Sequence, residues 1–494
     1  MNFLPVGGQL LRSRFSSPLF TVSSKLVYND ALRQRLVRGA DKWLSAQLGA
    51  DNRLSPAGHR FAEERWLIAR AVLHTVDRLI ARRAISPQVT GVITKLWGRA
   101  LSLMIAPSPA WQRFQAENGC RPPLLITVSH GHACNLHCTG CYANSGPDTA
   151  KLPWAILDRI VTEAKALWGI PLVTFSGGEP LAYRSEDKDV LDIVQKHADL
   201  LYLMFTNGTL IDKETAARLA RLGNLTPAIS VEGLRQRTDA WRGAGTFARV
   251  LQAMDNLRAA GVPFGISVTV TRANCHEVLS DEFLDFFFAQ QGAFYGFLFH
   301  YMYMPIGRHA SLEAMMTPEQ RIAFWQRTWE VVAEKRIFLM DFWNFCTMVQ
   351  VCISAGREGG YIYIDWNGKV MPCVFAPYAV ADMQQVYAQG GTLNDVWRAP
   401  FFQAIRQWQR EYGYGRPEPS PASNWLRPCP MRDHHGTFRQ LLSRYQPEPE
   451  DEAAGEVLAD GDYCANLVAY GQHLAEISQE IWEKEYLAGS NPVH

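Results

Sequence analysis

The sequence lacks three features that would place it in a large class of proteins. Its 494 residues carry 49 lysines and arginines against 48 aspartates and glutamates, so a net charge of +1 makes no general case for nucleic-acid binding. No apolar run is long enough to span a bilayer, and no apolar segment of the secretory type opens the chain. No repeat of solenoid length is present. We therefore expect a cytoplasmic protein of two or three folding units.

Ten cysteines are too few for a disulfide scaffold in a chain of this length, and several of them cluster at the spacing of metal ligands. The densest cluster is Cys134, Cys138 and Cys141. Thiolates at this spacing can surround one metal centre, and four-iron clusters are held by such cysteine sets. Three ligands would leave one iron free to bind a substrate or cofactor. The alternatives are unpaired core thiols or a zinc site completed by His132 and His137.

The first 120 residues predict a helical layer. Segments 61–81 and 93–104 carry apolar residues at helical spacing along one face. Between Arg78 and Ala116 there is no acidic residue, although basic residues are frequent. We favour a layer that docks on the following domain. The alternative is an interfacial helix that contacts anionic lipid.

From residue 124 onward, apolar runs alternate with amphipathic segments. Strands are predicted at 124–128, 172–175, 201–205, 227–231, 264–270 and 294–299. Helices are predicted at 153–168, 189–197, 213–222, 247–260 and 277–288. Six such units predict a parallel sheet, either open or curled into part of a barrel. In these folds the functional residues lie at the carboxyl ends of the strands.

Candidate binding residues follow the predicted strands in turn. They are Gly177, Gly178 and Glu179 after the second strand, Asn207 after the third, Ser230 and Glu232 after the fourth, and Arg242 in a later glycine-containing loop. Paired glycines let a backbone approach a ligand closely, and a carboxylate accepts hydrogen bonds from an ammonium group. Each motif alone is typical of a turn. Their placement on the same rim as the three cysteines predicts a joint site.

The Cys-x3-Cys-x2-Cys spacing, with Tyr142 directly after the third cysteine, resembles the signature of the radical S-adenosylmethionine (SAM) family. The resemblance covers about residues 124–308. It implies an α/β fold, a partial (β/α)6 TIM-type barrel, with a [4Fe-4S] cluster on the three cysteines. It also implies roles for the rim residues: Gly177, Gly178 and Glu179 at the amino group of SAM, Ser230 and Glu232 near its ribose or carboxylate, Arg242 at the carboxylate, and Asn207 as a weaker candidate.

The same resemblance implies the chemistry. SAM chelates the open iron, and one electron cleaves its carbon–sulfur bond to give a 5′-deoxyadenosyl radical that abstracts hydrogen from a substrate. The electron is expected to come from an external donor of the flavodoxin or ferredoxin type. The protein's own share is positioning and the exclusion of water.

A second set of cysteines follows the barrel, namely Cys346, Cys352, Cys373 and Cys429. Segment 361–372 alternates in polarity around Asn367-Gly368, which predicts a two-stranded hairpin. The pattern from Gly368 to Cys373 resembles the SPASM extension of radical SAM enzymes. The resemblance implies one auxiliary [4Fe-4S] cluster in a shortened SPASM domain, because the middle cysteine run of fuller members is absent.

Three further residues of this region carry expectations. Cys464 is an alternative fourth ligand of the auxiliary cluster, and Cys120 and Cys275 are expected in the core. Val374 stands where sulfatase-maturing members have an aspartate base. His434 and His435 are expected to be an exposed pair at a helix start.

The sequence thus predicts a radical SAM oxidoreductase or bond-forming enzyme. Its expected parts are an N-terminal helical region (1–122), a radical SAM partial barrel (123–335), a small α+β SPASM-like domain (336–445), and a solvated acidic linker with a C-terminal helix (446–494). The expected substrate is a small molecule, a peptide or a lipid, with peripheral contact at the inner face of the membrane in the lipid case. A metal-stabilised binding scaffold without turnover is the alternative.

Overall fold

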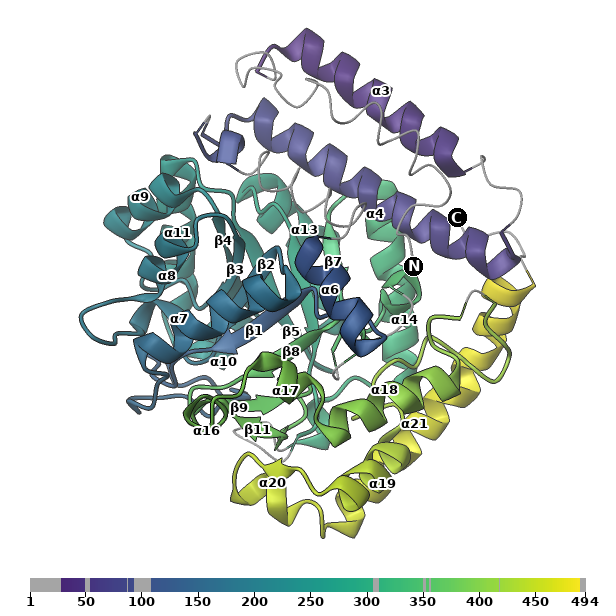
Figure 1. Cartoon of the computed structure of the whole chain (residues 1–494). Helices are drawn as coiled ribbons and strands as arrows, with labels where there is room; N and C mark the ends of the chain where they lie inside the picture. The colour runs from purple at the N-terminus through teal and green to yellow at the C-terminus, as the bar shows by residue number, and fades with distance from the viewer. Residues whose placement is uncertain are drawn as a thin grey trace.

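The computed structural model describes residues 28–48, 54–86, 88–92, 108–304, 311–349, 352–354, 357–416 and 418–488. Its centre is a ten-stranded sheet of order β11-β9-β8-β1-β2-β3-β4-β5-β6-β7 (Figure 1). The strands that run parallel from β1 to β7 are β1 (Leu125–Ser129), β2 (Leu172–Ser176), β3 (Leu201–Thr206), β4 (Leu225–Val231), β5 (Gly265–Val270), β6 (Gly296–His300) and β7 (Leu339–Asp341). The strand order does not close on itself, so the barrel is partial.

The six predicted strands are confirmed, but the sheet has two additional parallel strands. β7 has only three residues, which is too short for a periodic pattern to reveal. β8 (Tyr361–Ile364), the first strand of the predicted hairpin, pairs parallel with β1 and antiparallel with β9 (Lys369–Met371). The hairpin of the C-terminal region therefore extends the barrel sheet at its β1 edge.

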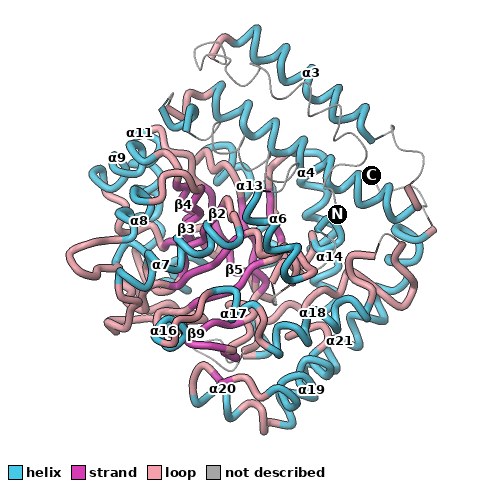
Figure 2. Tube along the Cα trace, in the orientation of Figure 1, coloured by secondary structure: helices cyan, strands magenta, loops and turns pink. Residues whose placement is uncertain are grey.

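Helices cover the outer face of the sheet, as Figure 2 shows. They are α7 (Trp154–Glu163) with the π-helical turn η2 (Ala164–Trp168), α8 (Val190–Lys196), α9 (Lys213–Leu222), α10 (Arg235–Arg242), α11 (Thr246–Ala260), α12 (Cys275–Val278) and α13 (Asp281–Leu284) with η4 (Asp285–Gln290). The 3₁₀ turns η3 (Pro180–Ala182) and η5 (Leu312–Ala314) lie in connections. After β6 the chain forms α14 (Pro318–Glu330) and η6 (Val331–Lys335). The predicted helix 277–288 is divided between α12, α13 and η4.

The N-terminal helices form the expected layer on the barrel. They are α3 (Asp30–Leu48), α4 (Pro56–Ala81) and α6 (Pro109–Asn118), with α3 outermost (Figure 1). Arg78 donates to the carbonyl of Arg336, and Arg82 donates to that of Ala289. These two basic side chains therefore hold α4 on the barrel, which supports the docked layer. The apolar stripe 93–104 lies outside the described residues.

The C-terminal region packs against the same sheet. Its elements are α15 (Cys346–Val349), β10 (Tyr378–Ala379), β11 (Ala381–Asp382), α16 (Met383–Ala388), α17 (Leu393–Trp397), α18 (Pro400–Tyr412), α19 (His435–Tyr445), β12 (Glu448–Pro449), α20 (Glu452–Glu456), α21 (Gly461–Ile481) and η7 (Trp482–Leu487). η7 returns to the N-terminal layer, where the hydroxyl of Tyr486 donates to the buried carboxylate of Glu64. The C-terminal end of the described chain is therefore packed against α4 of the N-terminal layer.

The prediction of a solvated acidic linker after residue 446 is wrong. β12 pairs with β10, the amide of Glu450 donates to the carbonyl of Pro377, and Ala454 is fully buried. The carboxylates of Glu448 and Glu452 do face solvent. Backbone pairing and a few apolar side chains thus fix a segment whose charges suggested solvation.

Among the described helices, none combines the length and apolarity needed to cross a membrane.

Candidate functional site

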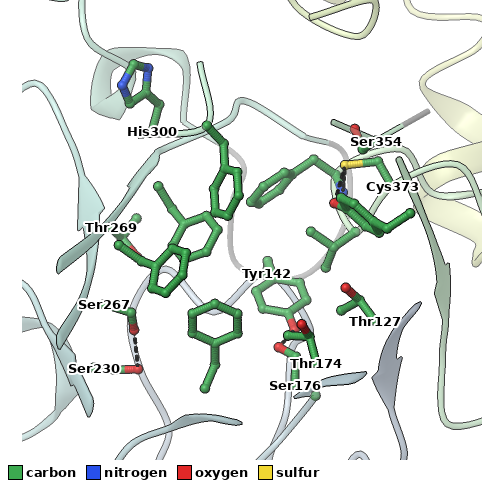
Figure 3. Close-up of a pocket in the computed structure, with 18 of the residues that line it drawn as sticks. Thr127, Tyr142, Thr174, Ser176, Ser230, Ser267, Thr269, His300, Ser354 and Cys373 are labelled. Atoms are coloured by element: carbon green, nitrogen blue, oxygen red, sulfur yellow. Dashed lines mark hydrogen bonds between the residues drawn. The ribbon is translucent and has the colours of Figure 1, made fainter. Parts of the chain in front are cut away.

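A cavity of about 410 Å³ opens inside the curved sheet (Figure 3). At one end lie the predicted ligands Cys134, Cys138 and Cys141, and at the other lie Cys352, Cys373 and Cys429. The described wall contains one arginine, Arg242, and no lysine, aspartate or glutamate. The chain thus brings six of its seven candidate metal ligands to a single space.

Aromatic rings make up much of the cavity wall (Figure 3). The ring of Phe205 meets those of Phe297 and Phe299 edge to face, with centroids 5.4 and 5.1 Å apart. Phe342 stacks on Phe297 at 5.5 Å. These phenylalanines come from β3, β6 and the end of β7, where the alternation of strand residues points them inward. Only their joint placement in the fold reveals the aromatic lining.

The paired glycines allow two loops to touch. The amides of Gly178 and Glu179 donate to the carbonyls of Gly131 and Ala133, at 3.0 and 2.8 Å. A Cβ on Gly178 would overlap the carbonyl oxygens of His132 and Ala133, and Gly177 has a φ of +118°. The loop after β2 is therefore locked onto the cysteine loop by backbone contacts that larger residues would prevent.

Glu179 joins the β2 and β3 ends instead of lining the cavity. Its carboxylate accepts hydrogen bonds from the Thr206 hydroxyl at 2.7 Å and from the Asn207 amide at 2.8 Å, and it is almost completely buried. Burial raises the pKa of Glu179, whereas these hydrogen bonds lower it. This geometry fixes Asn207, whose Nδ2 lies 3.7 Å from the Cys134 sulfur.

Glu232 and Arg242 form a buried pair behind the cavity wall. Arg242 Nε and Nη2 donate to the two oxygens of Glu232 at 2.5 and 2.6 Å. The remaining Arg242 nitrogen, Nη1, lies 3.9 Å from the Cys138 sulfur. Glu232 does not line the cavity, so it orients the guanidinium that does. Burial raises the pKa of Glu232, and the Arg242 charge opposes that shift.

Two other predicted rim residues face the cavity. The Ser230 hydroxyl is 3.1 Å from that of Ser267, and the Tyr142 hydroxyl is 2.9 Å from that of Ser176 (Figure 3). The Tyr142 ring meets Phe375 of the C-terminal region edge to face, at 6.4 Å. Tyr142 therefore stands where the barrel and the C-terminal region meet.

The second cysteine set gathers at the far end of the cavity. Burial raises the pKa of Cys352 to about 11 and of Cys429 to about 12, and a neighbouring thiol adds to each shift. Cys346 is fully buried beside Cys352, behind the cavity wall. Cys464 lies on the first turn of α21, outside the cavity lining. Cys120 and Cys275 pack against the core as predicted.

Buried arginines surround these thiols. Arg321 and Arg432 both donate to Asp433 Oδ1, at 2.7 and 2.9 Å, and the Cys429 amide donates to Asp433 Oδ2 at 3.1 Å. The two arginines hold the pKa of Asp433 far below its usual range against the opposing effect of burial. A [4Fe-4S] cluster with four thiolates is anionic, so buried guanidinium groups fit it electrostatically.

The histidine predictions have mixed outcomes. His434 and His435 do begin α19, but His435 is buried and His434 is only partly exposed, so the prediction of an exposed pair is wrong. Burial lowers the pKa of His434 to about 4. His132 has both ring nitrogens occupied, at 2.8 Å from Asp148 and 2.7 Å from the Ala143 carbonyl, so it is not free to complete a zinc site.

No three described His, Cys, Asp or Glu side chains converge tightly enough to hold a single metal ion. Cysteines around a four-iron cluster bind separate iron atoms and are spread more widely. The arrangement of three thiols around one end of a cavity, with Arg242 and Asn207 facing them, fits the larger group.

Comparisons with known proteins agree with this geometry. Residues 128–282 match the radical SAM superfamily, and residues 352–418 match SPASM, an iron–sulfur cluster-binding domain. The chain is 32% identical to the mycofactocin maturase MftC of Mycobacterium ulcerans over 310 aligned residues. The aligned region covers 60% of this chain and 80% of that protein. The chain belongs to the radical SAM superfamily.

Other relatives within this superfamily differ in their named products. The AdoMet-dependent heme synthase of Methanosarcina barkeri is 28% identical over 318 residues, covering 58% of this chain and 85% of its own. The fold is shared with Streptococcus suis SuiB bound to precursor peptide SuiA, with a TM-score of 0.50 and 15% identity over 72% of this chain and 81% of that one.

This radical SAM protein is therefore an enzyme that uses SAM and a [4Fe-4S] cluster. Its SPASM domain binds auxiliary iron–sulfur clusters. A binding scaffold without turnover is not favoured. The aromatic lining and the buried charged residues Arg321, Arg432 and Asp433 were not predicted from the sequence. The one available signal was the pair Arg432-Asp433 directly after the Cys429-Pro-Met run, since charges beside a buried ligand are usually paired.

Proposed function

We propose that this radical SAM enzyme modifies a peptide at an uncharged side chain held in the cavity between the two cysteine groups. The observation that carries the proposal is the continuous wall from Cys138 to Cys373, which is mostly apolar and whose one described arginine, Arg242, is already paired with Glu232. Transfer of an apolar side chain from water into such a space is favourable. A charged side chain would lose its hydration there without gaining a partner of opposite charge.

At the barrel end, Cys134, Cys138 and Cys141 would hold the radical SAM cluster, which with SAM supplies the hydrogen-abstracting radical. Gly177, Gly178, Ser230 and Tyr142 line the space for SAM. Arg242 would bind the SAM carboxylate, and Asn207 is placed by Glu179 to face the same ligand. Glu179 and Glu232 are then positioning residues, because their carboxylates are occupied by protein donors.

At the other end, Cys346, Cys352, Cys373 and Cys429 would hold one auxiliary [4Fe-4S] cluster. Burial of all four thiols near one another supports this set over one that includes Cys464. An external flavodoxin- or ferredoxin-type protein would supply electrons. The apolar wall would keep water from the reacting atoms. The contact between the Tyr142 and Phe375 rings would contribute to this exclusion.

The mycofactocin maturase similarity supports a peptide substrate, since a maturase processes a precursor. The heme synthase similarity raises a porphyrin as the competing substrate. Porphyrin carboxylates need cationic partners, and the one arginine of the described wall, Arg242, is already paired with Glu232 and assigned to the SAM carboxylate. The wall therefore favours the peptide.

The test is anaerobic turnover with reconstituted enzyme, SAM and reductant, measured as 5′-deoxyadenosine. The enzyme is offered the small-peptide fraction of a cell extract, the same fraction after protease digestion, and coproporphyrin. We expect the peptide fraction to raise 5′-deoxyadenosine at least tenfold over background, and digestion to remove the effect. Stimulation that resists protease, or that only the porphyrin gives, would overturn the proposal.

A cavity variant sharpens the result. Phe299→Asp places a carboxylate in the aromatic wall and should lose peptide-stimulated turnover at least tenfold, because the charge must stay hydrated there. Phe299→Leu keeps the wall apolar and should retain most of it.

A further inference from the structure

Arg432 is a fully buried cation whose hydrogen bonding is incomplete. Its Nε donates to Asp433 Oδ1 at 2.9 Å, but its two terminal nitrogens, Nη1 and Nη2, have no partner among the described residues. The guanidinium carbon lies 5.5 Å from the centre of the Trp343 ring and 5.6 Å from that of Tyr470. Buried guanidinium donors are rarely left unsatisfied, so an acceptor belongs beside these nitrogens.

The surroundings restrict what that acceptor is. Asp433 accepts from both Arg432 and Arg321, so these three side chains together carry one positive charge in excess. The same carboxylate accepts from the Cys429 amide, so the three charged side chains are anchored to a candidate cluster ligand. Arg432 is three residues from Cys429 in the sequence, and the Asp433 carboxylate joins its Nε to the Cys429 amide.

We propose that the terminal nitrogens of Arg432 donate to sulfur atoms of the auxiliary iron–sulfur cluster and hold its reduction potential above the value it would have without them. The inference rests on the proposed ligands Cys346, Cys352, Cys373 and Cys429. Arg432 acts through the cluster, so it is a positioning residue for the reaction.

The direction of the effect follows from charge. Reduction adds one electron to an already anionic, buried group, and a fixed cation beside that group stabilises the reduced form more than the oxidised form. The surrounding Trp343 and Tyr470 rings keep water away, so solvent screens the interaction little. The alternative acceptor is a buried water molecule, which would leave the potential nearly unchanged.

The test uses full-length protein in which Cys134, Cys138 and Cys141 are changed to Ala, so that only the auxiliary cluster is present. Its midpoint potential is measured by titration followed by electron paramagnetic resonance. Arg432→Met should lower the reduction equilibrium constant at least tenfold, which is 59 mV for a one-electron couple. Arg432→Lys keeps the positive charge but lacks the two terminal guanidinium nitrogens. Its midpoint potential should lie between that of the parent protein and that of Arg432→Met.

Arg406→Met is the matched control. Arg406 is also buried, lies 4.2 Å from the Trp397 ring centre and donates to the Trp397 carbonyl, but it does not face the candidate ligands. Its variant should keep the parent potential. If Arg432→Met also keeps it, the inference is wrong. If the parent triple variant binds no iron at all, the proposed ligand set has failed instead.

A second measurement needs no change at Arg432. Protein labelled with ¹⁵N at the arginine guanidinium should show a ¹⁵N coupling to the reduced auxiliary cluster in pulsed resonance spectra, and Arg432→Lys should remove the strongest coupling. If the labelled and unlabelled proteins give the same spectrum, the inference is wrong. This measurement does not depend on whether Arg432→Met assembles its cluster.

Discussion

The residues of the site differ in whether they line the cavity or hold in place the residues that line it. Gly177 and Gly178 let the β2 loop lie on the cysteine loop, Glu179 fixes Asn207, and Glu232 fixes Arg242. The strand-end motif that predicted direct contacts therefore also contains supporting side chains. Substitutions of cavity-lining residues and of supporting residues should therefore have effects that experiments can distinguish.

We expect Gly178→Ala to destabilise the site by about 1–3 kcal/mol, the usual cost of overpacking. The new Cβ would overlap two carbonyl oxygens of the cysteine loop and push the loops apart. Iron bound at the radical SAM site should fall, as measured by iron analysis after reconstitution. Gly146→Ala is the control, because its Cβ would meet only His137 Nδ1, at 3.9 Å. Equal iron content in the two variants would contradict this explanation.

Glu232→Gln should weaken SAM binding at least tenfold. Losing the carboxylate leaves the buried Arg242 charge without its partner, and breaking such a pair costs about 3–5 kcal/mol. SAM affinity can be measured by equilibrium dialysis. Glu277→Gln tests the specificity of the effect, since Glu277 pairs with Arg237 in a more exposed position outside the cavity. An unchanged affinity in Glu232→Gln would show that Arg242 does not need this support.

At the scale of elements, the main finding is that β8 continues the barrel sheet beyond β1. This pairing carries the hairpin of the SPASM domain to the barrel and directs Cys373 into the shared cavity. The acidic segment after α19 closes over the hairpin, where Lys369 donates to the side chain of Glu448 and to the carbonyl of Glu450.

This closure should depend on pH. Burial, together with the nearby Asp365, raises the pKa of Glu450 to about 8. The unfolded carboxyl ionises near 4.3. Between these values the folded state binds more protons, so the free energy of unfolding falls as the pH rises. Glu450→Gln should leave stability near pH 5 unchanged and raise the Tm near pH 8.5, on the order of 1–3 °C.

Thermal unfolding at the two pH values measures this effect. Glu448→Gln is the control, since Glu448 belongs to the same segment and its side chain is exposed to solvent. A Tm gain for Glu450→Gln that is equal at both pH values would attribute the effect to something other than its ionisation.

At the scale of the whole molecule, two cysteine groups share one cavity. The barrel supplies one group. The SPASM region supplies the other, from the segment after α15, the residues after β9 and the loop before α19. The N-terminal layer and the C-terminal helix support this arrangement from outside, through Glu64 and Tyr486. A substrate in the cavity would contact both ends.

The reconstituted protein should contain about eight irons, in two four-iron clusters. Changing Cys134, Cys138 and Cys141 to Ala should leave about four and abolish 5′-deoxyadenosine formation. Changing Cys352, Cys373 and Cys429 should also leave about four but retain SAM cleavage without substrate. Iron analysis and chromatography measure both quantities. About twelve irons in the wild type, or 5′-deoxyadenosine from the first variant, would contradict the assignment.

Most of the barrel could be predicted, because the first six strands and most of their helices are encoded by local periodicity and the motifs follow the strand ends in order. The boundaries of β2 and α9 agree with the prediction to within one residue. The prediction failed for β7, which is three residues long, and for the acidic segment, where composition suggested solvation but backbone pairing with β10 determines the structure.

The sequence alone determined the superfamily, the candidate cysteines and the succession of six strands along the chain, since these depend on residue type, spacing and local pattern. Tertiary structure decided which of those residues face the cavity, because Glu179 and Glu232 are turned toward protein donors by their neighbours. It also decided that Arg432 lies buried with two unsatisfied nitrogens, linked to the Cys429 amide through Asp433. Burial and pairing arise from segments distant in sequence, and no local pattern encodes them.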